Sequence, residues 1–369
     1  MIKRSKYLIV ALLVVTLRAN SYSQQTSDSR FGSRQGVAIP VTITNADGEH
    51  VSGLNASRFS LSEGGQDLAL VSAVEVAPVL VGKNKKKVIF VVLDAVGSSF
   101  KVQDEERKEC LQLLADSLIS ETPVSLSEID KDGLHTVHEL TTRNTTLAAA
   151  LLQLDNERSF LAGRDKLQAL VDATEDASLV VAETNHLRQF RRGSVDRASM
   201  MITFLAQLQA FQDMARALQH ANGRKAVLWL TGYFPIEIND TEDSLNIESY
   251  GIRSTFPVKS ATFDYQKTID LLNDAQISLF PVQLEGSQRT TIGLRQIARS
   301  TGGQETVSSD TVENLVKRTE DQLGNYYLLR FLPEVTKRDT HWKSLRVQLN
   351  EKSLTVKSPN GRFVFGPSN

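Results

Sequence analysis

The sequence predicts an α/β fold, in which a doubly wound sheet of mainly parallel strands stands beside a small β unit. A continuous apolar run at 88–93 ends abruptly at Asp94. Such a run is typical of a central strand that helices cover on both faces. Further apolar runs at 226–230 and 277–282 are separated from it by helix-like segments. Strands that alternate with helices in this way favour a doubly wound sheet.

The small β unit is predicted from strand-like segments at both ends of the chain. Apolar residues alternate with small or polar ones from Val37 to Ile43, and a turn sequence follows. Neither end has enough strands to bury a core alone, so we expect the two ends to pack together. The strand-like segments are 37–43, 59–61, 68–76, 326–332, 342–349, 353–357 and 363–365.

Two segments of the central region differ in their periodicity. In 195–220, apolar residues recur at spacings of three and four, which predicts a helix with one buried stripe. The stripe contains Ala198, Ile202, Leu205, Leu208, Phe211, Ala215 and Leu218. Residues 231–262 show no clear periodicity and are predicted to form a long loop, and loops of that length tend to be functional or disordered.

The first residues predict export. Three basic residues precede an apolar run at 8–17, and small residues follow, which is the layout of a secretory signal peptide. Cleavage is expected after Ser23, with Ala19 as the other candidate site. The apolar run is too short to span a bilayer comfortably. We therefore expect 1–23 to be removed, 24–35 to form a flexible linker, and the mature protein to be periplasmic or extracellular without a stable membrane anchor.

The overall charge argues against nucleic acid as a partner. The 369 residues include 42 lysines and arginines against 43 aspartates and glutamates, a formal net charge of −1. No global field would therefore hold a polyanion. Hydrophobic residues make up 41% of the chain, as in an ordinary soluble globular protein. Cys110 is the single cysteine, so no intramolecular disulfide can form.

Signals of enzymatic chemistry are scarce. The sequence contains neither a Gly-x-Ser-x-Gly nor a Gly-x-x-x-x-Gly-Lys motif. His135 and His138 are three positions apart on a predicted strand, so their side chains point to opposite faces and cannot form a ligand pair. Asp94 stands at the carboxyl end of a strand, where catalytic acids often lie, so a hydrolase remains an alternative. The leading expectation is that the protein is not an enzyme and uses no cofactor.

The region 128–139 fits two patterns. Its acidic residues and Gly133 match the spacing of a calcium-binding loop. The flanking segments 124–129 and 134–140 alternate like strands, however, and Asp132-Gly133 is a preferred two-residue turn. The sequence therefore predicts a β-hairpin here.

Several segments resemble one protein family. Residues 88–99 resemble the first strand and metal-site loop of a von Willebrand factor A domain, and 223–230 resemble its fourth strand. More narrowly, the segments 294–303, 325–329 and 341–347 make the chain similar to the acidobacterial VWFA-related secreted proteins.

The resemblance spans residues 36–365 and implies a division into domains. It implies an N-terminal β unit at 36–80 and a Rossmann-type, von Willebrand factor A-like domain at 85–323. A C-terminal β segment at 325–366 would pack with the N-terminal unit.

The resemblance also implies a degenerate metal site. In metal-binding members, an Asp-x-Ser-x-Ser loop, a threonine and an aspartate after the fourth strand hold a divalent cation. Asp94 and Ser98 match the ends of that loop, but Val96 replaces the middle serine. After the fourth strand, Gly232 stands where an aspartate is usual. Hard cations need several oxygen ligands, so Asp94 and Ser98 are expected to be vestigial ligands that hold no metal.

The family implies a protein ligand, bound by loops at the carboxyl ends of the strands. Aromatic residues on an exposed loop suit such an interface. The expected ligand-binding face contains Asp94, Ser98, Ser99, Tyr233, Phe234, Glu237 and Asp240. We therefore expect an exported adhesion, interaction or scaffold protein with an unidentified protein partner. The alternatives are a metal-dependent adhesin with an intact but unrecognised metal site, and a hydrolase on a Rossmann-like sheet.

Overall fold

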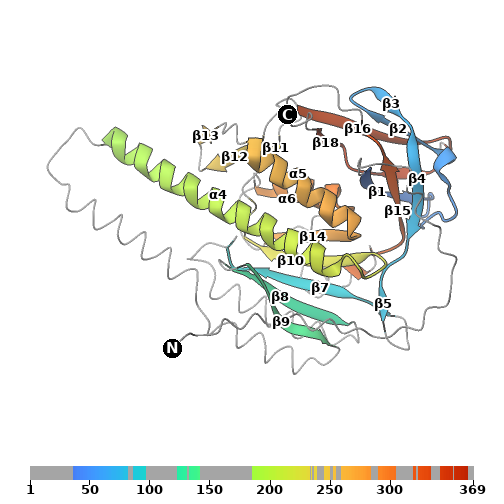
Figure 1. Ribbon diagram of the computed structural model, residues 1–369, viewed down its shortest axis with the longest axis horizontal. Helices are drawn as coiled ribbons and strands as arrows, with labels where there is room; N and C mark the ends of the chain where they lie inside the picture. Colours follow the sequence, from blue (N-terminus) through green and yellow to red (C-terminus); the bar gives the residue numbers. More distant parts are fainter. Residues whose placement is uncertain are drawn as a thin grey trace, which may run out of the picture. The chain divides into compact units, whose positions relative to one another are not determined.

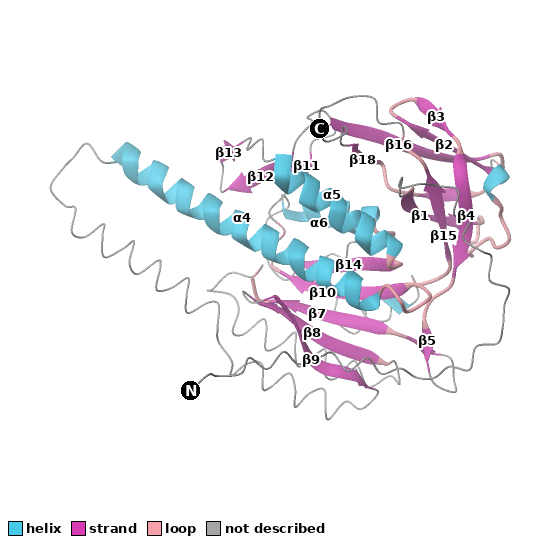
Figure 2. Ribbon diagram, viewed as in Figure 1, coloured by secondary structure: helices cyan, strands magenta, loops and turns pink. Residues whose placement is uncertain are grey.

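Strands predominate in this protein, and one block of them is parallel (Figures 1 and 2). The structure is a computed structural model. It describes residues 36–81, 86–96, 123–130, 133–141, 185–232, 234, 237–238, 245–249, 252–254, 259–283, 290–304, 319–320, 323–333, 341–351 and 353–364. The predicted signal peptide and linker, the helix that contains Cys110, and the turn at 131–132 lie outside the described residues.

The parallel block contains the apolar runs that the sequence analysis singled out. Its strands are β7 (Ile89–Asp94), β8 (Val124–Asp130), β10 (Lys225–Thr231) and β14 (Ile277–Gln283), in the order β14-β10-β7-β8. All three pairings between them are parallel. Strand β9 (Gly133–Thr141) then adds to β8 in the antiparallel direction, and Asp130 pairs with Gly133. The predicted β-hairpin at 124–140 is thus confirmed.

Three long helices pack on one face of the parallel block. They are α4 (Asn185–Leu218), α5 (Lys259–Asp274) and α6 (Thr290–Ser300), and Figure 1 shows α4 and α5 running side by side. Their buried side chains form one apolar cluster with side chains from β7, β10 and β14, among them Val92, Trp229 and Leu279. The side chains that alternate with these on the strands, such as Val91 and Leu228, are buried as well.

Two antiparallel sheets combine strands from both ends of the described chain. One has the order β17-β1-β15-β4 and the other β18-β16-β2-β3. Buried apolar side chains from both sheets, including Val41, Leu61 and Val347, form a second core. The strands of the first sheet are β17 (Thr355–Lys357), β1 (Val37–Thr44), β15 (Tyr326–Phe331) and β4 (Leu70–Val76). Those of the second are β18 (Gly361–Val364), β16 (His341–Leu349), β2 (Phe59–Glu63) and β3 (Gln66–Leu68).

Short elements complete the described chain. A single 3-10 turn, η1, covers Ala56–Arg58. Strands β5 (Leu80–Val81) and β6 (Lys86–Lys87) pair with each other. The segment predicted as a long loop contains β11 (Glu237–Ile238), β12 (Leu245–Ser249) and β13 (Ile252–Ser254), which form a small antiparallel sheet. The prediction of a structureless loop at 231–262 was therefore wrong in its middle part.

The predicted fold class also needs correction. In the part of the chain that the structure describes, eighteen strands stand against three α-helices. Ten strand pairings are antiparallel, and three are parallel. The protein is a β-rich molecule with several antiparallel sheets, and the prediction of an α/β, doubly wound fold is wrong. A continuous apolar run reports burial on both faces of its own strand, but it says nothing about the number or direction of the others.

The parallel block and the antiparallel sheets belong to one compact unit at 36–369. Arg224, just before β10, joins them: its guanidinium donates to Ser278 Oγ, to the Gly324 carbonyl at 2.9 Å and to the Gly302 carbonyl at 2.6 Å. The group also lies 4.8 Å from the centre of the Tyr326 ring. Burial lowers the pKa of Arg224 to about 10, although the nearby Tyr326 counteracts this. Among the described residues, no helix is long and apolar enough to cross a membrane.

Candidate functional site at the carboxyl edge of the parallel strands

Three polar residues end neighbouring parallel strands, and together they form what we call the carboxyl-edge row. Asp94 ends β7, Thr231 ends β10 and Gln283 ends β14. The register aligns Thr231 with Gln283, and it places Thr231 one position beyond the Leu230–Leu93 pair, beside Asp94. The sequence analysis found Asp94 but not the other two. The sequence could have indicated Thr231 and Gln283 too, because each is the first polar residue after an apolar run.

Asp94 is the centre of a hydrogen-bond network. Its Oδ2 atom accepts from Gln207 Nε2 at 2.7 Å, from Trp229 Nε1 at 3.1 Å and from Thr231 Oγ1 at 2.7 Å. All four side chains are buried, with Asp94 4% exposed. A buried carboxylate is costly unless hydrogen bonds compensate for lost hydration. These donors provide that compensation.

This network restricts what Asp94 can do chemically. An oxygen that already accepts three hydrogen bonds has little capacity left for a metal ion. Val96 is buried in the main apolar cluster, and its carbonyl accepts from Thr203 Oγ1 at 3.3 Å. The described residues contain no group of three or more histidine, cysteine, aspartate or glutamate side chains placed to hold a metal. Through its Oδ2 atom, Asp94 ties α4 to β7 and β10.

Most of the other residues predicted for the ligand-binding face are not described by the structure. Ser98, Ser99, Tyr233 and Asp240 lie outside the described residues. Glu237 begins β11, and only its place in the backbone is described. The structure therefore does not bring these residues together into a described site.

The prediction that Phe234 and Asp94 belong to an exposed ligand-binding face requires a correction. Phe234 is 1% exposed, and its ring lies 5.5 Å from that of Phe204 and 5.4 Å from that of Trp229. The expectation that this aromatic residue and Asp94 lie on an exposed face is wrong, because both side chains are buried. The reason is local packing: the ring of Phe234 lies beside Phe204 of α4 and Trp229 of β10.

Apolar side chains that sequence reasoning missed are exposed near the same edge. Ile202 is 58% exposed and Leu205 39%, both on α4. The contacts of Thr203 with Val96 and of Gln207 with Asp94 place this part of α4 at the carboxyl end of β7. Phe263 and Ile292, 49% and 38% exposed, lie in the first turns of α5 and α6, which follow β10 and β14. The prediction that Ile202 and Leu205 belong to the buried stripe was wrong.

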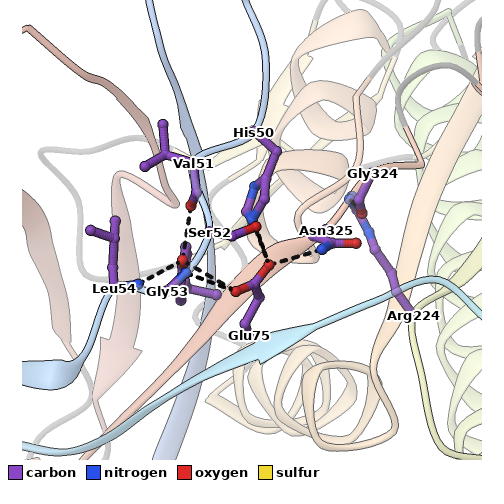
Figure 3. Close-up of polar contacts among 10 residues, drawn as sticks. His50, Val51, Ser52, Gly53, Leu54, Glu75, Arg224, Gly324 and Asn325 are labelled. Carbon is purple, nitrogen blue, oxygen red and sulfur yellow. Dashed lines mark hydrogen bonds and ion pairs between the residues drawn. The ribbon is translucent and has the colours of Figure 1, made fainter.

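A second polar network lies in the antiparallel sheets, around Glu75 of β4 (Figure 3). Glu75 Oε1 accepts from Asn325 Nδ2 at 2.8 Å and from Ser52 Oγ at 2.9 Å, and it lies 3.0 Å from His50 Nε2. Glu75 Oε2 accepts from the Gly53 backbone N–H at 3.1 Å. Burial alone would raise the pKa of this carboxyl, but these hydrogen bonds outweigh it and lower the pKa to about 2.

Tyr327 of β15 extends this network to the loop at residues 50–54. Its hydroxyl donates to the Val51 carbonyl at 2.8 Å and accepts from the Leu54 N–H at 3.0 Å. Its ring stacks on His50, with 5.5 Å between ring centres. Glu75 and Tyr327 therefore hold residues 50–54 against β4 and β15. These contacts hold the loop at 50–54 in place, so the cluster acts as a structural clamp.

Comparison with known proteins does not identify the chain. No family model matches the sequence, and no curated protein matches it. Among solved structures, a mutant of the PilB minor pilin from Streptococcus sanguinis is similar over 64% of this chain, with 10% identity and a TM-score of 0.33. The matched region covers 60% of that pilin chain. A score at this level does not establish a shared fold.

Proposed function

We propose that this is an exported protein that binds a protein partner without a metal ion, at the carboxyl edge of its parallel strands. The observation that carries the proposal is the contrast at that edge: the polar row is buried, whereas large apolar side chains near it are exposed. Ile202, Leu205, Phe263 and Ile292 are four of the seven large hydrophobic residues that are exposed among the described residues. Apolar and aromatic side chains exposed near one another favour contact with a protein.

The resemblance to von Willebrand factor A-like secreted proteins supports the same proposal from the sequence. In that family the loops at this edge bind proteins, and metal-binding members use a cation to do so. Here Asp94 is occupied by three hydrogen-bond donors. Binding would therefore rest on apolar contacts near the edge. The predicted signal peptide places this activity in the periplasm or outside the cell.

Site-specific photocrosslinking tests the proposal. A photoreactive phenylalanine analogue is introduced at Ile202 or Phe263 of the full-length protein, expressed in its native host and irradiated. Gln209 of α4 and Lys267 of α5 are matched controls, since they are exposed on the same helices but are polar. We expect a discrete crosslinked protein from the first two positions, an absent or weaker one from the controls, and no change in EDTA.

Other outcomes would contradict the proposal. Equal crosslinking from all four positions would mean that the apolar side chains are not a binding surface. Loss of the crosslink in EDTA would favour the metal-dependent adhesin instead.

A further inference from the structure

A small cavity lies where α5 meets the antiparallel sheets. Tyr265, Asp270 and Asn273 of α5 line one side, and Trp342 and Arg362 line the other, with Ser300 at the end of α6. The volume of the cavity is about 10 Å³, which is about the space that one water molecule occupies in such a measure. Phosphate, nucleotides and sugars are too large for it.

Three residues that line this cavity each carry a buried polar atom without a hydrogen-bond partner among the described residues. Tyr265 Oη, Asn273 Oδ1 and Arg362 Nε have no hydrogen-bond partner in the part of the chain that the structure describes. Their residues are 1%, 3% and 8% exposed. A buried polar atom without a partner costs free energy, and such atoms in native proteins usually have one in the protein or in ordered water. Three of them around one cavity call for a ligand.

The orientation of Asn273 is fixed by its other contacts. Its Nδ2 donates to the Ala38 carbonyl at 3.2 Å and to the Ser300 carbonyl at 3.1 Å. Rotating the amide by half a turn would set Oδ1 against two carbonyl oxygens, so the observed orientation is the favourable one. The unsatisfied atom is therefore an acceptor.

Tyr265 and Arg362 add donors. Burial raises the pKa of Tyr265, so its hydroxyl keeps its proton. The Ser300 side chain does not reach it with hydrogen-bond geometry. Arg362 lines the cavity, and its Nη1 donates to Glu63 Oε1 at 3.2 Å, which holds the guanidinium in place.

We propose that this cavity is a buried water site, and that one ordered water molecule joins α5 to the antiparallel sheets. The water donates a hydrogen bond to Asn273 Oδ1 and accepts hydrogen bonds from Tyr265 Oη and Arg362 Nε. This combination matches a molecule that both donates and accepts, and a buried water typically makes two to four hydrogen bonds. An anion is disfavoured, because the Asp270 carboxyl lines the same cavity.

The sign of a stability change tests the proposal. If the Tyr265 hydroxyl is hydrated, Tyr265→Phe removes a satisfied group, and the urea midpoint of unfolding falls. If the cavity is dry, the same change removes an unsatisfied group, and the midpoint stays or rises. Tyr327→Phe is the matched reference, since that hydroxyl has two backbone partners and its loss must lower the midpoint.

A high-resolution crystal structure of the unmodified protein gives the second readout and does not depend on the variant folding. We expect a fully occupied water within about 3.2 Å of at least two of the three atoms. A cavity without ordered density, or a Tyr265→Phe midpoint equal to or above that of the unmodified protein, would overturn the proposal.

Discussion

Gln207 of α4 donates a hydrogen bond to Asp94 of β7 over 2.7 Å, and both side chains are buried. Trp229 and Thr231 of β10 donate to the same carboxylate oxygen. One side chain therefore joins two strands and a helix at the edge where the proposed partner binds. Asp94 stabilises the structure of this edge, where we propose that the exposed apolar side chains contact a partner.

Asp94→Ala tests this structural role. The change removes a buried carboxylate that accepts three hydrogen bonds, so we expect the free energy of unfolding to fall by about 3 kcal/mol, as measured by urea denaturation. Asp213→Ala is the control, because Asp213 pairs with Arg216 on the surface of α4, and a surface pair contributes at most about 1 kcal/mol. A variant of Asp94 as stable as the control would show that the network contributes little.

Glu75 predicts a dependence of stability on acid pH. Its pKa in the folded protein is about 2, below the ordinary value of 4.5. The ionised carboxylate therefore stabilises the fold above a pH of about 4.5, and this contribution is lost as pH falls through the range from 4.5 toward 2. We expect Glu75→Gln to lower the urea midpoint at neutral pH and to flatten its fall across that acid range.

Glu351→Gln is the control for the Glu75 experiment. Glu351 is 43% exposed and pairs with Arg58 at the surface, so its replacement should leave the acid dependence as it is. If the Glu75 and Glu351 variants show the same pH profile, the loop at 50–54 is not held by the Glu75 carboxylate.

Deletion of residues 325–369 tests how the antiparallel sheets depend on both ends of the chain. It removes β15 and β17, which flank β1, and β16, which pairs with β2. The strands at 36–81 would then expose unpaired edges, which promote aggregation. We expect limited proteolysis to digest this segment rapidly in the deletion variant but not in the full chain. Equal protection in both would mean that 36–81 folds without the C-terminal strands.

The sequence predicted the strands of the parallel block better than it predicted the rest of the fold. The apolar runs at 88–93, 226–230 and 277–282 became β7, β10 and β14, because strands buried on both faces leave a continuous signal. Short strands such as β11 and β13 leave none. The overall fold class was wrong because the strands from both ends of the chain, which the sequence placed in a small β unit, form two four-stranded antiparallel sheets.

The candidate site was predicted only in part. Asp94 stood out because it ends an apolar run, but its burial depends on Gln207, which is 113 positions away in the sequence. Periodicity placed Ile202 and Leu205 with Leu208 on one helical stripe, but only Leu208 is buried. A stripe defined by spacing is wider than the surface that actually meets the strands, and its margin is settled by tertiary packing.

Export remains a prediction from the sequence, and it has a direct test. The basic start, the apolar run at 8–17 and the small residues near Ser23 should direct cleavage there. Cell fractionation and N-terminal sequencing of the exported form should find a mature protein that begins just after Ser23 or Ala19. A protein that keeps Met1 and sediments with the membrane would contradict the prediction.

The last prediction concerns metal, because it separates the proposed function from the metal-dependent adhesin. Mg²⁺ gives up its hydration shell reluctantly and needs a nearly octahedral set of oxygen ligands. At the carboxyl edge, Asp94 accepts three hydrogen bonds through one oxygen, and the nearby Val96 offers only a buried apolar side chain. We therefore expect calorimetry to detect no stoichiometric binding of Mg²⁺ or Mn²⁺ at millimolar metal, and partner crosslinking at Phe263 to persist in EDTA.

Thr231→Ala provides an internal comparison, since it removes one donor from Asp94 and frees acceptor capacity without adding a ligand. It should lower stability and still bind no metal. Tight binding by the unmodified protein would mean that other side chains complete a metal site, and the adhesin would then replace the metal-independent function.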